Sequence, residues 1–169
     1  MFVKPEDFSK GILRLPSTQA NDIDLQTVID RVEPDILQKM LGCALYELFI
    51  EDYNTDPENE FSEERFKKIY DKFCQDDDCG IVQSEGIKEM LKYFIYVDYV
   101  NNFPVQVVDK GIVRVNAENS ENATQQQMGL PLTYNKGVDT YAAIQWFMCE
   151  NEADYPENNM QPLRPISWL

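Results

Sequence analysis

The chain has 169 residues, a formal net charge of −15 and no histidine. The charge argues against binding to nucleic-acid phosphates or to an anionic membrane surface, because both need clustered lysine and arginine side chains. The absence of histidine excludes Ser-His-Asp triads, histidine general bases and histidine metal ligands. A chain of this length is expected to form one domain with its own core.

The four cysteines do not form the pattern of a disulfide framework or a zinc site. Cys43 and Cys149 lie inside apolar helical patterns and are predicted to be small core residues. Cys74 and Cys79 have no second pair at zinc spacing. The opening residues do not resemble a signal peptide, and no apolar run is long enough to span a membrane. We therefore expect no metal, no cofactor, no membrane partner, and synthesis in a reducing cytoplasm.

The N-terminal half is predicted to be an arm followed by helices. Residues 1–20 have apolar side chains without a sustained period, so they indicate an extended arm against its own domain or a neighbour. A first helix is expected to begin at Asp22. Pro34 is predicted to start a second helix, running to about Asp52, rather than to kink the first. Gly42, inside that second helix, would let another helix approach closely.

Three further helices are predicted downstream. The third runs from about Ser62 to Gln75. The fourth, from an N-cap at Ser84 to Phe103, is apolar on nearly every side and must therefore lie at the centre of the bundle. The last begins at Leu132 or Gly137 and ends near Asn151.

Two acidic turns separate these helices. Residues 51–60 carry carboxylates at the ligand spacing of a calcium-binding EF-hand loop, but Pro57 stands where that loop needs glycine. The triplet at 76–78 precedes Gly80. Both stretches are predicted to be solvated turns.

Residues 104–116 have period-two alternation around a turn with glycine, which predicts a β-hairpin. No other strand is clear from the sequence, and a lone hairpin is marginal in water. It therefore packs either on another polypeptide or flat on its own helices. A polar loop, about 116–131, follows. The proline-rich tail, 157–169, ends in apolar residues; it is either a segment that docks in a partner's groove or a disordered end.

These elements predict a mainly α fold: a small helical bundle of four to five helices with an inserted β-hairpin and extended terminal arms. The predicted connector domain is 1–156, and the docking tail is 157–169.

Four segments in this order resemble one known family. They are 25–49 with Leu41, Gly42, Leu45 and Tyr46; 86–96; 111–121 with its Gly-Ile-Val and Glu-Asn-Ser-Glu strings; and 134–156 with Tyr134, Asn135, Asn151, Tyr155 and Pro156. Together they resemble the head-to-tail connector proteins of tailed phages, in particular the version found in crassviruses and other phages of Bacteroidetes hosts. The tail at 157–169 lies outside this resemblance.

The resemblance implies a ring at the virion neck, usually of twelve copies, bound beneath the portal protein. Such a ring extends the DNA channel, receives further neck or tail proteins, and contains no catalytic residues. An acidic channel suits this role, because it repels DNA phosphates rather than holding them. The candidate interface residues are Val105, Val107, Ile112, Val113, Val115, Trp146, Pro165, Ile166, Trp168 and Leu169. The candidate channel-facing acids are Glu51, Asp52, Asp56, Glu58, Asp76, Asp77 and Asp78.

Two other function classes stay open. The first is an acidic binding module that mimics DNA and blocks a basic partner, for which the −15 charge is the argument. The second is an enzyme with paired carboxylates, for which Glu85 and Glu89 share one helix face.

Overall fold

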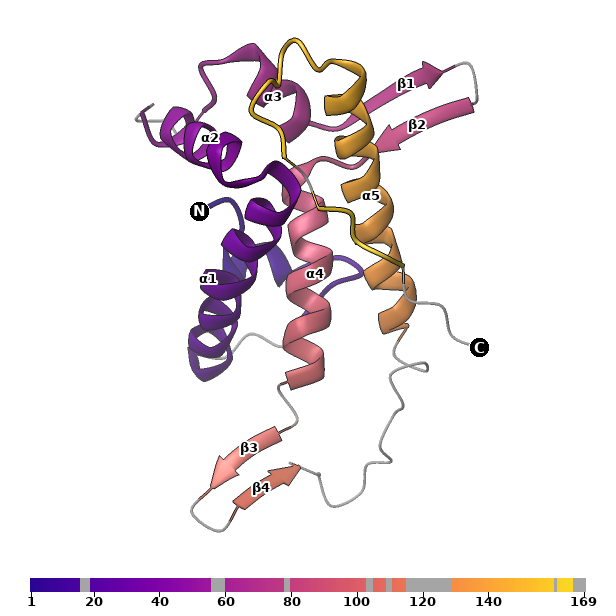
Figure 1. Cartoon of the computed structure of the whole chain (residues 1–169). Helices are drawn as coiled ribbons and strands as arrows, with labels where there is room; N and C mark the ends of the chain where they lie inside the picture. Colours follow the sequence, from indigo (N-terminus) through magenta and orange to yellow (C-terminus); the bar gives the residue numbers. More distant parts are fainter. Residues whose placement is uncertain are drawn as a thin grey trace.

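The computed structural model describes residues 1–15, 19–55, 60–77, 80–102, 105–108, 111–114, 129–159 and 161–165. Within these ranges the side chains of 19–21, 77, 102, 105–108 and 111–114 are not described. Five α-helices and two separate β-hairpins occur in the described residues (Figure 1). The predicted class, a small and mainly helical bundle with an inserted hairpin, is confirmed.

The first helix does not break at its proline. Helix α1 spans Gln19–Leu41 with Pro34 inside it, so the prediction of a new helix at Pro34 is wrong. A proline inside a helix costs about 3 kcal/mol, and burial of residues on both sides of it, such as Ile29 and Leu37, offsets that cost. The chain breaks instead at Gly42, whose φ of +75° is left-handed. Helix α2, Cys43–Thr55, begins directly after it.

Gly42 does allow a close approach, but not by a helix. A Cβ at this position would lie 2.9 Å from the backbone oxygen of Asn159. The C-terminal segment of the chain therefore crosses the α1–α2 break, which corrects the prediction of a helix–helix contact.

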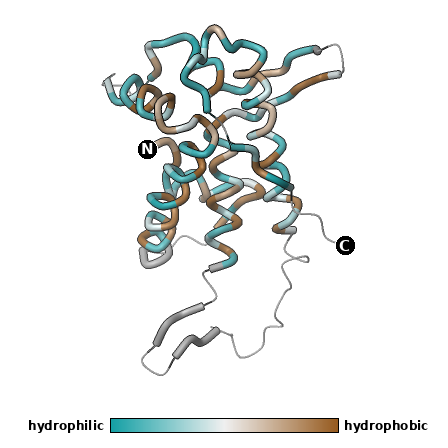
Figure 2. The backbone as a smooth tube through the Cα atoms, in the orientation of Figure 1, coloured by the Kyte–Doolittle hydropathy of each residue, from teal (hydrophilic) through white to brown (hydrophobic). Residues whose placement is uncertain are grey.

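The predicted central helix is confirmed. Helix α4, Ile87–Asn102, lies between α1 and the last helix α5, Leu130–Glu150 (Figure 1). Phe94 of α4 fits against Gly137 of α5, where a Cβ would lie only 3.0 Å from the ring. Figure 2 shows hydrophobic and hydrophilic residues alternating along the helices, as expected for helices with one buried side.

A second hairpin lies where the sequence predicted helix. Helix α3 is short, Glu64–Tyr70, and Phe73–Asp77 forms strand β1, so the predicted helix to Gln75 is wrong. Strand β2, Gly80–Ser84, pairs with β1 in antiparallel register from Phe73 opposite Ser84 to Asp77 opposite Gly80. Ser84 therefore ends a strand rather than capping α4. Its buried hydroxyl accepts a hydrogen bond from the Gly86 N–H at 3.1 Å.

The geometry at Gly86 explains why α3 stops early. Gly86 has a φ of +89°, and a Cβ there would lie 2.6 Å from the backbone oxygen of Tyr70. The chain entering α4 is thus pressed against the end of α3. After residues 71 and 72 the chain turns away, and Phe73–Asp77 pairs with β2, which overrides the helical period of this stretch.

The hairpin predicted at 104–116 is present. Strand β3, Val105–Val108, pairs antiparallel with β4, Gly111–Arg114, with Val105 opposite Arg114.

The N-terminal residues pack on their own chain. Phe2, Val3 and Phe8 are buried, the last in a short 3-10 helix at Pro5–Phe8. The ring centroid of Phe2 lies 4.4 Å from that of Tyr53 and 5.4 Å from that of Phe49. Of the two positions expected for this arm, the structure has the one against its own domain.

A buried carboxylate holds this N-terminal segment in place. Both Glu33 oxygens accept hydrogen bonds from the Phe2 N–H at 3.1 Å, and one also accepts from the Val3 N–H at 3.1 Å. Burial raises the pKa of Glu33, although these backbone hydrogen bonds act in the opposite direction.

The C-terminal segment also stays on the bundle past residue 156. The Gln161 N–H donates to the Lys39 carbonyl at 2.9 Å, and the Gln161 carbonyl accepts from the Tyr141 hydroxyl and from Gln145 Nε2. Leu163 packs on the core. Part of the predicted docking tail, around Gln161 and Leu163, therefore lies on its own chain. The apolar tip, 166–169, lies outside the described residues, so its docking on a partner stays a prediction.

The cysteine prediction is also corrected. Cys43 and Cys149 are exposed rather than buried in the core. Each lies at the solvent side of a helix whose other side is packed.

Candidate functional site

The predicted interface residues fall into three groups. Four of them, Val105, Val107, Ile112 and Val113, lie on β3 and β4, where the backbone is described and the side chains are not. Trp146 is half-buried on α5, and Pro165 is exposed. The remaining four, Val115, Ile166, Trp168 and Leu169, lie outside the described residues. Their role as an interface stays a prediction.

The predicted channel-facing acids are not brought together into one patch. Glu51 is exposed on α2 and Asp76 is exposed on β1, and these elements lie on opposite sides of the molecule in Figure 1. Asp77 is described only in its backbone, and Asp56, Glu58 and Asp78 lie outside the described residues.

Asp52 has a local structural role. Its carboxylate accepts hydrogen bonds from the backbone N–H groups of Ser62 at 3.0 Å and Glu63 at 3.1 Å, just before α3 begins. These are amides that no helical carbonyl can satisfy, so Asp52 stabilises the start of α3.

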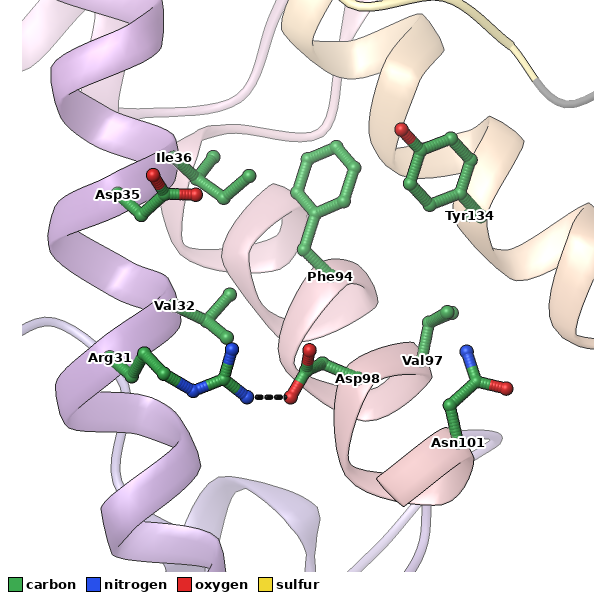
Figure 3. Close-up of a pocket in the computed structure, with 9 residues that line it drawn as sticks. All are labelled: Arg31, Val32, Asp35, Ile36, Phe94, Val97, Asp98, Asn101 and Tyr134. Atoms are coloured by element: carbon green, nitrogen blue, oxygen red, sulfur yellow. Dashed lines mark hydrogen bonds and ion pairs between the residues drawn. The ribbon is translucent and has the colours of Figure 1, made fainter.

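A pocket of about 540 Å³ opens between α1, α4 and the start of α5 (Figure 3). Its apolar lining comes from Val32, Ile36, Phe94 and Val97, and Arg31 forms an ion pair with Asp98 across one side.

The carboxylates of this pocket are already paired with cations. Asp98 faces Arg31, and Asp35 accepts from Lys39 Nζ at 2.6 Å. The chain has no histidine to stand beside these carboxylates. The pocket is thus an apolar surface hollow with two ion pairs at its edge.

The Glu85–Glu89 pair does not form a two-carboxylate site either. The Tyr93 hydroxyl donates to Glu85, and Lys92 forms an ion pair with Glu89 at 2.8 Å. Burial, followed by the hydrogen bond to Glu85, raises the pKa of Tyr93. Each carboxylate is thus tied to its own partner on the surface of α4.

The hairpin β1–β2 has one packed face and one open face. Phe73 and Val82 are half-buried and Ser84 is buried on the face toward the bundle, where the Phe73 ring lies 5.0 Å from Phe147 of α5. The opposite face is exposed throughout. It presents Cys74, Asp76, Ile81 and Gln83. Ile81, 70% exposed, stands opposite Asp76 in the strand register.

A second apolar surface lies in a groove of about 390 Å³ between the N-terminal loop, the middle of α4 and the first turns of α5. Ile12 is 91% exposed and Leu132 is 72% exposed on its walls. Tyr93 and Tyr96 are half-buried in it. Its charged lining residues are Lys10, Lys92, Lys136 and Glu89. We call this surface the lysine-rimmed groove.

Sequence reasoning missed both surfaces, although signals for one were present. Two short apolar runs, Phe73-Cys74 and Ile81-Val82, flank an acidic stretch that ends in glycine, which is a hairpin signal. The groove has no local signal, because its walls come from three segments far apart in the chain.

Among the described residues, no three cysteine, aspartate or glutamate side chains gather in a way that could hold a metal ion. In the same part of the chain, every helix is too short or too polar to cross a membrane.

No curated protein and no solved structure matches this chain. A family model described as a family of unknown function, DUF6712, matches residues 37–161, from the second half of α1 to the segment that docks on α1 and α5. Because this match covers most of the chain, the protein belongs to the DUF6712 family.

Proposed function

We propose that this chain is a structural virion protein that forms a ring at the neck of a tailed phage, between the portal protein and the tail. The ring, of twelve copies, extends the DNA channel and provides the attachment site for the tail. The four segments that resemble phage connectors support the proposal. So does the small helical bundle with an inserted hairpin, which is the fold that the resemblance implies.

One observation carries the proposal: the chain closes its own core, yet leaves large apolar side chains exposed on the hairpin β1–β2 and in the lysine-rimmed groove, besides Ile23 on α1. The core contains fully buried residues from α1, α2, α3, α4 and α5. Ile81, Ile12 and Leu132 are nevertheless largely exposed, at the hairpin and in the lysine-rimmed groove. An apolar surface rimmed by polar residues, such as the lysine-rimmed groove, is typical of protein–protein contacts, whereas single exposed apolar residues are common on any protein. A chain with this groove and with an unpartnered hairpin face is suited to contact two neighbours, as a ring subunit does.

The charge of the chain supports passage of DNA without binding. Of the described acids in the predicted set, Glu51 is exposed on α2 and is free to face a channel. Asp52 is engaged at the start of α3, and Asp76 lies on the open face of the hairpin β1–β2 on the other side of the molecule. The acids at 56, 58, 77 and 78 belong to the same proposal. Carboxylates that line a channel repel the phosphates of DNA, so DNA can pass without being bound.

Light scattering and electron microscopy of the purified protein, alone and mixed with its portal protein, test this function. We expect rings in one or both preparations, and antibody labelling at the neck of virions. A protein that remains monomeric and fails to bind the portal contradicts the proposal. If such a monomer captured a basic protein in a salt-sensitive way, it would instead be an acidic binding module.

A further inference from the structure

We propose that the open face of hairpin β1–β2 on one copy docks into the lysine-rimmed groove of a second copy of the same chain. This inference rests on the proposed ring and names the contact that would join its neighbouring subunits.

The hairpin supplies an apolar group next to negative charge. Ile81 lies directly opposite Asp76 in the register, so the two side chains share the open face. The other face of the hairpin already packs on α5 through Phe73. Since a two-stranded hairpin is marginal in water by itself, covering its open face with a partner would stabilise it.

The groove supplies an apolar surface next to positive charge. A hydrogen bond of 2.9 Å from the Leu15 N–H to the Phe8 carbonyl closes the N-terminal loop, and Gly11 turns inside it with a φ of +87°. This closed loop presents Ile12 on one side of the groove. Leu132, in the first turn of α5, stands on another.

The charges of the two surfaces are complementary. The chain has 30 acidic and 15 basic residues, yet the groove has three lysines and one glutamate. Lys92 is paired with Glu89, whereas Lys10 and Lys136 are exposed and form no ion pair within the described residues. They can face the carboxylate of Asp76, which is exposed on the open face of the hairpin. Burial of Ile81 against Ile12 and Leu132 would supply the binding free energy, and the charges would select the partner and its orientation.

The placement of the two surfaces makes the contact intermolecular. The hairpin extends away from the helices at the end of the bundle where α5 ends, whereas the groove lies where α5 begins (Figure 1). Because two different patches meet, the contact is head-to-tail, and repeating it generates a closed ring or an open filament. Figure 2 shows hydrophobic residues in the outer half of β2 on this projecting hairpin.

Two single variants and their mixture test this contact. Ile81→Asp blocks the hairpin and leaves the groove intact, and Leu132→Asp does the reverse. We expect each variant alone to lose self-association by about tenfold or more, because a charge replaces an apolar anchor. An equimolar mixture has one intact hairpin–groove pair per two chains. It should therefore form heterodimers but no rings, measured by light scattering under the conditions in which the wild type assembles, free or on the portal.

Ile23→Asp is the matched control, because Ile23 is 63% exposed on α1, away from both surfaces. It should assemble as the wild type does. Thermal unfolding should show all three variants folded, since each changes an exposed side chain. A charge exchange adds a second test: Asp76→Lys should weaken assembly, and adding Lys136→Glu to the same chain should restore it.

The outcomes separate this inference from the function on which it rests. If the wild type assembles and Ile81→Asp and Leu132→Asp assemble equally well, the hairpin–groove contact is wrong and the ring stands. If Leu132→Asp loses only portal binding while self-association persists, the groove binds the portal and the inference is also wrong. If the wild type neither self-associates nor binds the portal, the ring proposal fails.

Discussion

Residues 1–15 and the hairpin β1–β2 are both short, partly apolar segments at the edge of the bundle. They differ in how far their apolar side chains are buried. Phe2 is 3% exposed in a cluster of aromatic rings, whereas Ile81 is 70% exposed on the outer face of its hairpin. The N-terminal segment has a buried carboxylate to accept its backbone N–H groups and a core to receive its side chains. The hairpin has such support only on its inner face. A similar apolar content therefore stabilises the monomer in one region and leaves a surface for a partner in the other.

The largest loss of unfolding free energy is expected from a substitution of Phe2. Phe2→Ala should lower the free energy of unfolding by about 3–5 kcal/mol, because it leaves a cavity among Phe49, Tyr53 and Tyr70. Urea unfolding followed by circular dichroism measures this. Phe2→Leu, which keeps most of the volume, should cost clearly less. If Phe2→Ala had the small effect of a surface substitution, the N-terminal segment would not be part of the core.

The next largest loss of unfolding free energy is expected at Gly86. Gly86→Ala should cost roughly 1–3 kcal/mol, because the residue has a φ of +89° and its new Cβ would press on the Tyr70 backbone. Gly11→Ala is a matched control, since Gly11 has a nearly equal φ of +87° and no atom within 4 Å of the added carbon. The difference between the two variants in urea unfolding isolates the steric contact at the base of the hairpin. Equal costs would show that this contact is not tight.

Glu33 gives the N-terminal segment a pH dependence. Since burial raises its pKa above the ordinary value of 4.5, the folded state holds the proton more tightly than the unfolded state. The Glu33 contribution is therefore fully present below about pH 4.5 and is lost as the pH rises through the raised pKa. Compared with Glu33→Gln, the wild type should lose unfolding free energy over this window. An equal pH dependence of the unfolding free energy in the two proteins would show that the pKa of Glu33 is not raised in the folded state.

The smallest effect on folding is expected at the hairpin. Ile81→Ser should change the unfolding free energy by less than about 0.5 kcal/mol, because the side chain is already in water. Thermal unfolding of the monomer measures this. A loss as large as that of Phe2→Ala would mean that Ile81 is covered in the isolated chain, and the contrast between the two regions would disappear.

Much of the fold could be predicted from periodicity. The stripes of α4 and α5, with Ile87, Met90, Leu91, Tyr141 and Ile144, are buried as their spacing indicates. The hairpin at 105–114 follows from its alternation and its glycine turn. These elements are set by local spacing, so they appear in the sequence itself.

The candidate surfaces could not be predicted in the same way. The groove needs Ile12 from the N-terminal loop and Leu132 from α5 on either side of α4, and no local pattern joins them. The break between α1 and α2 needs Asn159 beside Gly42, more than a hundred residues away. In the sequence, Glu33 is only a polar residue near an expected helix boundary. Its role as acceptor of N-terminal backbone N–H groups depends on the tertiary structure.

The sequence by itself determined the helical class, the central position of α4 and the acidity, because residue spacing and charge are local properties. Tertiary structure decided that Pro34 lies within a helix and that residues 73–77 form a strand. It also decided that Phe2 is buried and Ile81 is exposed. The physical reason is that the free energy of an apolar or polar group depends on what covers it, and distant segments supply that cover.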